Sequence, residues 1–329
     1  MLSTSFVGSN VFFFSHEGMN ERIKNILRTV FAPVLSIKHR WERARIRRLG
    51  IRNPRKLASI RYKNRTGRDL DWNNPQDLDE KVNWLKFNTD TSEWTRLSDK
   101  YLVRDYLIER GHEDLLVKLY GVWSDADEID FDQLPDRFVL KTNHGSGLVM
   151  IVKDKRQLDI PQTRKTLNKW LKVPYGIESV EMQYLPIKPR LIAEELLEDD
   201  NPDSFSLVDY KVFCLDGKAY CFMICANRVM GVHMEATFYD LDWHIIPNVL
   251  TSEHKNDHVA VRKPQCLPEL IKAAEDLAKG HPEVRVDFYI VGNKIYFGEM
   301  TFYPWSGYVQ FTPDEWDFRF GEDFELRKY

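Results

Sequence analysis

VRVDFYIVGNKIYFGEMT, residues 284–301, is the stretch of this chain that decides its fold. Four apolar residues alternate in it with polar ones, among them Arg285 and Asp287, and this period of two is typical of a half-buried strand. A second strand follows at 294–301 and carries Glu299. The stretch therefore predicts a β-hairpin with two carboxylates.

The connection between the strands decides whether Asp287 and Glu299 cooperate, because neighbouring side chains on a strand point to opposite faces. A two-residue turn at 292–293 puts them on opposite faces. A three-residue connection at 291–293 places Asp287 opposite Phe297 and leaves Glu299 as its diagonal neighbour on the same face, with Cβ atoms roughly 7 Å apart. We expect the three-residue connection and a shared Mg²⁺. The alternative is a solvated face with ordinary charges.

The composition is that of a globular protein with a large core. The chain has 329 residues, 43% of them hydrophobic, enough for about two domains. Its four cysteines lack the spacing of a disulfide scaffold, which favours a reducing cytoplasm. The apolar run at 11–14 is far shorter than the ~20 residues of a membrane span and has no basic segment before it, so neither a span nor export is expected. Met19 is an alternative start, with 1–18 as a leader.

Charge is distributed unevenly along the chain. Residues 1–68 hold 16 of the 47 Lys and Arg and three acids, a net of +13, which leaves −16 for the rest. Apolar residues at helical spacing in 21–48 predict a basic amphipathic helix pair. Residues 21–68 suit the anionic inner face of a membrane as a peripheral contact; the alternative is a helix packed on the acidic body with its basic side in solvent. No nucleic-acid-reading motif accompanies the charge, so no nucleic-acid partner is expected.

Two segments before the hairpin carry candidate phosphate ligands. A helix is expected to start at Ser98, which puts Lys100 in its first turn, where an anionic ligand would offset the conflict between a cation and the helix dipole. RFVLKTNHGSGLVMIV, residues 137–152, reads as strand, glycine-containing loop and strand, without the GxxxxGK[ST] pattern of a Walker A loop. Such a loop either folds over phosphates, with Lys141 at its start, or is a plain surface turn. His144 is expected to be exposed.

Two further segments place polar groups at strand ends. In RLIAEELL, residues 190–197, an apolar strand runs into Glu194-Glu195, which either meet an adenine edge or simply end the strand. Residues 208–224 read as a hairpin about an Asp-Gly turn, with Asp209 and Lys211 on one strand face.

The order of these signals along the chain resembles the ATP-grasp superfamily. LSDKYLVRDYL, FVLKTNHGSG, DYKVFCLDGKAY and VDFYIVGNKIYFGEMTFYPWSG are similar to the TupA-like ATP-grasp family, associated with polysaccharide and teichuronopeptide biosynthesis. The resemblance spans residues 75–325 and implies an α+β chain with the ATP-grasp fold, in which two α+β subdomains grip ATP. The small subdomain, with the glycine-rich loop, is expected at 137–195, and the large one, with the metal site, at 196–329. Residues 71–136 then form a helical N-terminal part, and 1–70 a basic helical extension.

The resemblance also implies roles for individual residues. The expected ATP contacts are Lys100, Lys141, Asn143, His144, Gly145, Ser146, Gly147, Glu194, Glu195 and Leu196. The expected Mg²⁺ ligands are Asp287, Glu299 and Thr301, the last standing where many members have the Asn of a Glu-x-Asn motif. Arg285 and Lys211 are expected to balance charge in catalysis, and Asp209 and Arg228 to bind the acceptor.

Members of the superfamily commonly transfer the γ-phosphoryl group of ATP to a carboxylate, after which an amine displaces phosphate to form an amide. The resemblance thus implies a cytoplasmic ATP- and Mg²⁺-dependent ligase that joins an amino acid or amine to a carboxylated sugar, such as a uronic acid of a capsular or cell-wall polysaccharide. Two alternatives stay open. One is a kinase on the same fold; the other is a glycosyltransferase of polysaccharide assembly, for which the sequence has no nucleotide-sugar motif.

Overall fold

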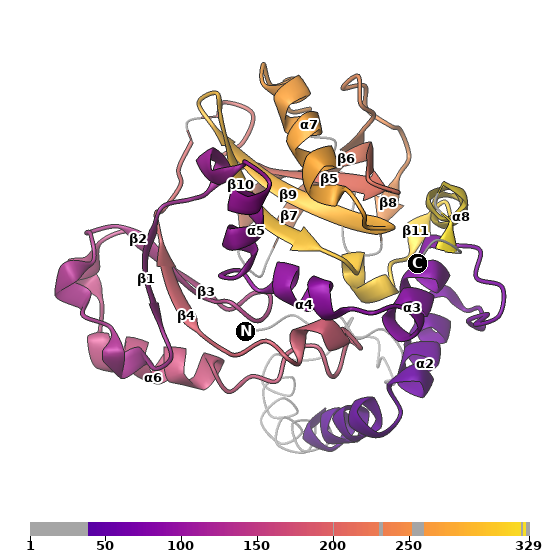
Figure 1. The fold of residues 1–329 in the computed structure, drawn as a ribbon, viewed down its shortest axis with the longest axis horizontal. Helices are drawn as coiled ribbons and strands as arrows, with labels where there is room; N and C mark the ends of the chain where they lie inside the picture. Colours follow the sequence, from indigo (N-terminus) through magenta and orange to yellow (C-terminus); the bar gives the residue numbers. More distant parts are fainter. Residues whose placement is uncertain (1–38, 200, 230–232, 252–259, 324, 327–329) are drawn as a thin grey trace, which may run out of the picture.

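The computed structural model describes residues 39–199, 201–229, 233–251, 260–323 and 325–326. It consists of a helical N-terminal part and two antiparallel sheets with helices packed on them (Figure 1). The expected leader at 1–18 lies outside the described residues, as does most of the helix pair expected at 21–48. The last part of that pair is described, as a helix over residues 39–52.

The smaller sheet contains the glycine-rich loop. Its strands are β1 (Leu119–Trp123), β4 (Leu191–Glu194), β2 (Phe138–Thr142) and β3 (Val149–Val152), in that spatial order. The helix α6 (Ile160–Trp170) packs on this sheet, where its Leu167 joins Phe138 and Leu191 in a separate hydrophobic core. The loop between β2 and β3 therefore projects from the edge of a sheet whose own core holds it in place.

The larger sheet contains the hairpin. Its strands are β10 (Lys294–Thr301), β9 (Glu283–Val291), β5 (Asp209–Leu215), β6 (Lys218–Val229) and β7 (His233–Tyr239), in that order. The helix α7 (Leu267–Ala278) packs against β5, β6 and β9 (Figure 1). Both faces of the central strand β5 are covered, so that all seven of its residues are buried. A short pair, β8 (Leu250–Thr251) and β11 (Phe311–Thr312), completes the strands.

Between the helix at 39–52 and the first strand, the chain forms four α-helices. They are α2 (Pro54–Thr66), α3 (Leu78–Asn88), α4 (Ser92–Ser98) and α5 (Val103–Glu109). The expected helix start at Ser98 is wrong, because α4 ends there and a turn separates it from α5. The Asp99 carboxylate causes the break: it accepts hydrogen bonds from the backbone N–H groups of Tyr101 (2.8 Å) and Leu102 (3.2 Å). Lys100 therefore lies in a turn and in no helix.

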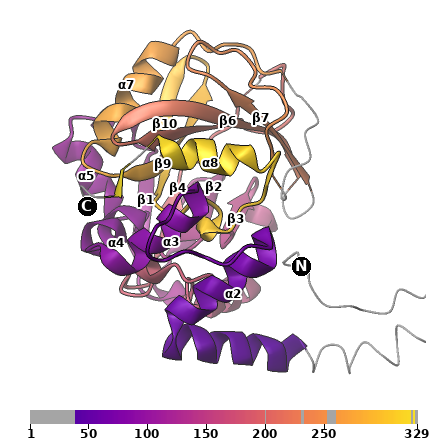
Figure 2. The same cartoon turned by 90° about the vertical axis from the view of Figure 1, so that its right-hand side faces the viewer.

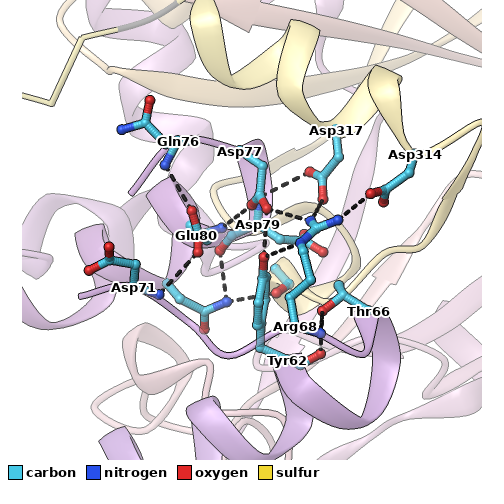
Figure 3. Close-up of polar contacts among 12 residues, drawn as sticks. Tyr62, Thr66, Arg68, Asp71, Gln76, Asp77, Asp79, Glu80, Asp314 and Asp317 are labelled. Atoms are coloured by element: carbon cyan, nitrogen blue, oxygen red, sulfur yellow. Dashed lines mark hydrogen bonds and ion pairs between the residues drawn. The ribbon is translucent and has the colours of Figure 1, made fainter. Parts of the chain in front are cut away.

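A buried polar cluster joins α2 and α3 to the C-terminal helix α8 (Glu315–Glu322) (Figure 3). The Asp77 carboxylate caps α3 by accepting from the N–H of Glu80 at 2.7 Å, and it also accepts from the Tyr62 hydroxyl at 2.6 Å. Arg68 donates to Asp77 at 2.6 Å and reaches Asp317 of α8 at 3.4 Å. The cluster fixes the helical N-terminal part against the end of the chain.

Two further observations concern membrane-spanning helices and cysteines. Over the described ranges, no helix combines the length and apolar character needed to cross a bilayer. The four cysteines, Cys214, Cys221, Cys225 and Cys266, are buried and unbridged.

Candidate active site

The β9–β10 hairpin brings its two carboxylates together by a different route from the one expected. Val291 pairs with Lys294, so the connection is the two-residue turn 292–293. A β-bulge between Phe297 and Glu299 then shifts the register, and Glu299 pairs directly with Asp287. The three-residue connection is wrong, but the same-face placement of the carboxylates is confirmed, because one bulged residue reverses the face on which all later side chains of β10 lie.

Gly298 is the extra residue of the bulge. A Cβ atom at this position would lie 3.0 Å from the carbonyl oxygen of Asp287 and 3.3 Å from the Tyr289 ring. The two strands thus approach each other too closely here for a larger residue. Glycine in this motif therefore permits the register that aligns Asp287 with Glu299.

Asp287 is enclosed by cations. The Arg285 guanidinium donates to both of its oxygens, at 2.7 and 2.8 Å, and the Lys211 ammonium on the neighbouring strand β5 donates to Oδ2. Lys211 is in register with Asp287, which explains why the two side chains meet. All three residues are buried. The two cations offset the free-energy cost of burying the charged Asp287 carboxylate.

Glu299 faces the turn that carries Lys100. Its Oε2 lies 3.0 Å from the Lys100 Nζ, and its Oε1 lies 3.8 Å from Arg285. Burial raises the pKa of the Glu299 carboxyl, but the ammonium of Lys100 and the charges of Lys211 and Arg285 outweigh it and hold that pKa well below its usual range. Glu299 is consequently ionised at any physiological pH.

Further paired charges lie on the neighbouring strands β5 and β6. The Asp209 carboxylate lies 3.7 Å from the Lys211 Nζ and 2.6 Å from the Arg228 guanidinium. Burial lowers the pKa of the Arg228 guanidinium, but the nearby charges, that of Asp209 first, together outweigh burial. The net pKa of Arg228 is therefore raised. Arg228 and Asp209 thus pair with each other, one strand away from the hairpin carboxylates.

Lys100 links the two sheets. Its Nζ donates to the carbonyl oxygen of Gly145, in the glycine-rich loop, at 3.0 Å while it pairs with Glu299 of the hairpin. Its backbone N–H donates to the carbonyl oxygen of Asn143 at 3.1 Å. A single side chain therefore connects the phosphate-loop candidate to the metal-site candidate, which sequence spacing alone did not indicate.

Buried hydrogen bonds hold the first half of the glycine-rich loop in place. Asn143 is fully buried, and its side-chain N–H groups donate to Asp99 (2.9 Å) and to the carbonyl oxygen of Lys188 (3.0 Å), while its Oδ1 accepts from the N–H of Arg190 (2.7 Å). The expectation that His144 is exposed is wrong, because the ring is only 3% exposed. Its Nε2 lies 3.2 Å from the carbonyl oxygen of Val173. Burial lowers the pKa of His144 and favours the neutral ring.

The second half of the loop is open. Ser146 and Gly147 are exposed, and the positive φ of Gly147 (76°) favours glycine. Gly145 lies against Tyr175, whose ring a Cβ atom would meet at 2.9 Å. The loop therefore has a buried, anchored start and an accessible tip.

Glu194 is the last residue of β4, in the smaller sheet. Its carboxylate is flanked by Lys141 Nζ at 2.5 Å and by the Arg104 guanidinium at 3.6 Å. Glu195 and Leu196 follow directly and are half-buried, with the N–H of Glu195 donating to the carbonyl oxygen of Lys118 at 2.9 Å. Lys141 thus points to the glutamate at the end of β4, and among the described residues it makes no contact with the hairpin.

The sequence reasoning missed Arg104 and Tyr289. Arg104 lies four residues after Lys100 in the same sequence motif, and that proximity was the available signal. Tyr289 shares a strand face with Asp287 and pairs in register with Asp209. The pKa of its hydroxyl is raised, first by the charge of Asp209 and then by burial.

The hairpin residues fit a magnesium ion. Magnesium takes oxygen ligands, usually one or two carboxylates, with water and substrate phosphates completing the octahedron. Asp287 and Glu299 supply two adjacent carboxylates, and the Thr301 hydroxyl lies 3.5 Å from Glu299 Oε1. Among the described residues, no group of three or more Asp, Glu, His or Cys side chains converges so that it could hold a metal ion.

Comparison with known proteins agrees with this arrangement. A family model described as TupA-like ATPgrasp matches residues 80–325. No curated protein matches the sequence. Solved structures with a similar fold include the D-alanine–D-alanine ligase of Bacillus anthracis complexed with ATP, with 14% identity, TM-score 0.39, and coverage of 68% of this chain and 56% of the ligase.

Two other ligases are also among the solved structures similar to this chain. The L-amino acid ligase of Bacillus licheniformis has 10% identity and TM-score 0.43, with 68% of this chain and 48% of that chain covered. The D-alanine–D-alanine ligase of Helicobacter pylori has 16% identity and TM-score 0.39, with coverages of 77% and 68%. The chain thus spans about half the length of two of these three ligases. Because the family model covers most of the chain and includes both the glycine-rich loop and the carboxylate hairpin, the chain belongs to the TupA-like ATP-grasp family and has the ATP-grasp fold.

Proposed function

We propose that this chain is an ATP- and Mg²⁺-dependent ligase that activates a carboxylate as an acyl phosphate and joins it to an amine. The substrate we propose is a carboxylated sugar, such as a uronic acid of a capsular or cell-wall polysaccharide, and the second substrate is an amino acid or other amine. The observation that carries this proposal is the convergence of Asp287, Glu299 and Lys100 beside the glycine-rich loop.

The charge balance of the site supports phosphoryl transfer. Each carboxylate of the hairpin is paired with cations that a bound polyanion would also attract: Glu299 with Lys100, and Asp287 with Lys211 and Arg285. Asp287 and Glu299 would hold Mg²⁺, which would supply positive charge to neutralise the phosphates. The cations then face the phosphates, as phosphoryl transfer requires.

The nucleotide is proposed to extend from the hairpin to the end of β4. Lys100 and the open loop tip at 146–147 contact the phosphates, and Glu194, Glu195 and the backbone of Leu196 meet the ribose and adenine. Lys141, held 2.5 Å from Glu194, reaches the nucleotide from the same end. Since Asn143 and His144 are buried, their part is to anchor the loop.

The first step forms one bond and breaks one, and the second forms one bond and breaks two. A carboxylate oxygen of the acceptor attacks the γ-phosphorus, the bond to the β,γ-bridging oxygen breaks, and ADP leaves. The amine nitrogen then attacks the acyl carbon, the carbon–oxygen bond to phosphate breaks, and the nitrogen loses a proton as the amide forms. Arg285 and Lys211 stabilise the negative charge that spreads over the transferred group. Arg228, next to Asp209, binds the acceptor carboxylate.

The experiment follows ADP and phosphate release with Mg²⁺ and ATP against a panel of uronic acids, each with and without amino acids. We expect ADP and phosphate in equal amounts, dependent on both substrates. Hydroxylamine in place of the amine should trap the acyl phosphate as a hydroxamate. The matched control is Glu299→Gln, which keeps the size of the side chain and removes a metal-binding charge.

The same experiment separates the alternatives. A phosphorylated sugar that accumulates without any need for an amine supports the kinase. Turnover of a nucleotide sugar in the absence of ATP contradicts both the ligase and the kinase.

A further inference from the structure

The helical extension carries a basic surface that the proposed activity does not use. The described part of the extension at 39–66 contains eleven Lys and Arg and a single acid, Glu42. Its apolar side is packed: Leu57, Ala58 and Tyr62 form a core with Val180 and Tyr308 of the body. The apolar side of α2 thus packs on the body, and the basic residues around it lie in solvent.

Most of these cations have no partner within the described part of the chain. Arg43 pairs with Glu178 (2.9 Å) and Lys63 with Asp69 (2.7 Å). The remaining exposed cations, for which no ion pair to a described carboxylate is found, are Arg40, Arg45, Arg47, Arg48, Arg52, Arg55 and Lys56. Because no described carboxylate neutralises these cations, they leave a positive surface that attracts an external anion.

Large apolar side chains stand exposed among the cations. Trp41 is 75% exposed, Ile51 64% and Ile60 39%. Ile51 and Arg52 end the first described helix, and Arg55 and Lys56 begin α2, so the apolar and basic groups meet where the two helices join. The two helices lie together at one end of the molecule in both views (Figures 1 and 2).

A groove runs along α2 at this surface. It has a volume of about 510 Å³ and is lined by Arg55, Lys56, Ile60, Lys63 and Trp72, among others. The Arg55 guanidinium lies 4.3 Å from the centre of the Trp72 ring, which holds that cation at the groove. The groove offers cations and an indole ring to a group that is anionic at one end.

We propose that the 39–66 surface binds an anionic phospholipid bilayer. Cations attract the negative leaflet, while an exposed indole and isoleucines enter the boundary between headgroups and acyl chains. A bare polyanion such as nucleic acid would leave Trp41 and Ile51 without an apolar partner. The rest of the chain carries a net charge of −16 over residues 69–329, so the same leaflet repels the body and orients the extension toward the membrane.

The experiment is co-sedimentation of the full chain with lipid vesicles at low and high salt. One set contains phosphatidylcholine alone and the other adds phosphatidylglycerol. We expect binding to the anionic vesicles only, weakened by salt. The charge-reversal variant R45E/R48E/R52E/K56E should lose at least a hundredfold in affinity, since each charge near the surface contributes about fivefold. The matched control K153E/K165E/K169E/K272E reverses four exposed lysines of the body and should still bind.

Two further variants separate the membrane from other polyanions. Trp41→Ala and Ile51→Ser should each weaken vesicle binding severalfold without changing the affinity for a DNA duplex or an acidic polysaccharide. Should charge reversal prevent folding, the milder set R45Q/R48Q/R52Q/K56Q takes its place. Absence of binding to anionic vesicles, equal binding by the charge-reversal and control variants, or binding that ignores both Trp41 and Ile51 would overturn the proposal.

Discussion

Lys100 and Glu299 form an ion pair across the two sheets, with Nζ and Oε2 3.0 Å apart, while the same Nζ donates to the carbonyl oxygen of Gly145. The pair places one cation between the carboxylate hairpin and the glycine-rich loop. In the proposed enzyme Lys100 contacts the phosphates, and Glu299 would hold Mg²⁺ together with Asp287. The ion pair therefore holds the site together before ATP arrives.

Lys100→Ala should lower kcat/KM for ATP by about a hundredfold, because a cation aimed at the transferred phosphate is lost. Stability should change little, since the exposed part of the pair is screened. Steady-state kinetics with varied ATP checks the first point and urea unfolding the second. Lys118→Ala, at an exposed lysine just before β1, is the control and should behave as wild type. An unchanged kcat/KM for Lys100→Ala would remove the lysine from the site.

Asp287→Ala and Glu299→Ala should both abolish Mg²⁺-ATP turnover but differ in stability. Removing Asp287 takes from two buried cations, Arg285 and Lys211, the carboxylate nearest to both, which costs about 3–5 kcal/mol. Removing Glu299, whose side chain is 30% exposed, should cost less than about 1 kcal/mol. Chemical denaturation measures the difference, and calorimetric titration with Mg²⁺-ATP measures binding. Equal destabilisation by the two substitutions would contradict the pairing described for Asp287.

Gly298→Ala should damage the site more than the fold. A Cβ atom 3.0 Å from the Asp287 carbonyl oxygen forces the bulge to shift, and the two carboxylates then lose their alignment. We expect a loss of at least tenfold in kcat with about 1–2 kcal/mol of destabilisation. Gly292→Asn, in the turn of the same hairpin, is the control, because its φ of 60° suits asparagine. Normal kinetics in Gly298→Ala would show that the bulge does not set the site.

Asp79→Asn should stabilise the protein increasingly as pH rises. Asp79 is fully buried, and its pKa is raised well above the usual value, first by burial and then by Asp317 and Asp77. A carboxyl whose folded pKa exceeds its unfolded pKa contributes stability below the unfolded pKa, about 3.9, and that contribution is lost as pH rises through the folded pKa. The neutral amide avoids this loss, so the stability gain should reach about 1 kcal/mol or more near pH 8 and vanish near pH 4.

Urea unfolding of Asp79→Asn and wild type between pH 4 and pH 8 measures this difference. Asp105→Asn changes an exposed carboxylate on α5 and is the matched control. A gain that is independent of pH would contradict the assigned cause.

The sequence determined the chemistry and the order of the parts. The alternation of Val284 to Ile290 fixed a strand with Asp287 on its polar side, since a period of two allows no other regular structure. The order of the motifs indicated the ATP-grasp fold, and the family match agrees with it. Local patterns suffice here because backbone period and turn chemistry act between near neighbours.

Helix boundaries and burial were harder to predict. The break after Ser98 depends on the Asp99 side chain binding two backbone N–H groups, one conformation among several open to that dipeptide. The burial of His144 depends on chain from residue 173, which is distant in sequence. Neither is encoded in the periodicity of its own segment.

Only the tertiary structure decided which carboxylates and cations meet. The bulge at Gly298, which aligns Glu299 with Asp287, arises from how closely β9 and β10 pack, and the sequence is compatible with other registers. Lys100 reaches Glu299 because the turn between α4 and α5 packs beneath the glycine-rich loop, a contact between segments far apart in the chain. Residue types and periods follow from short-range sterics, whereas the pairing of charges follows from the packing of whole elements, and that packing minimises exposed apolar surface over the entire chain.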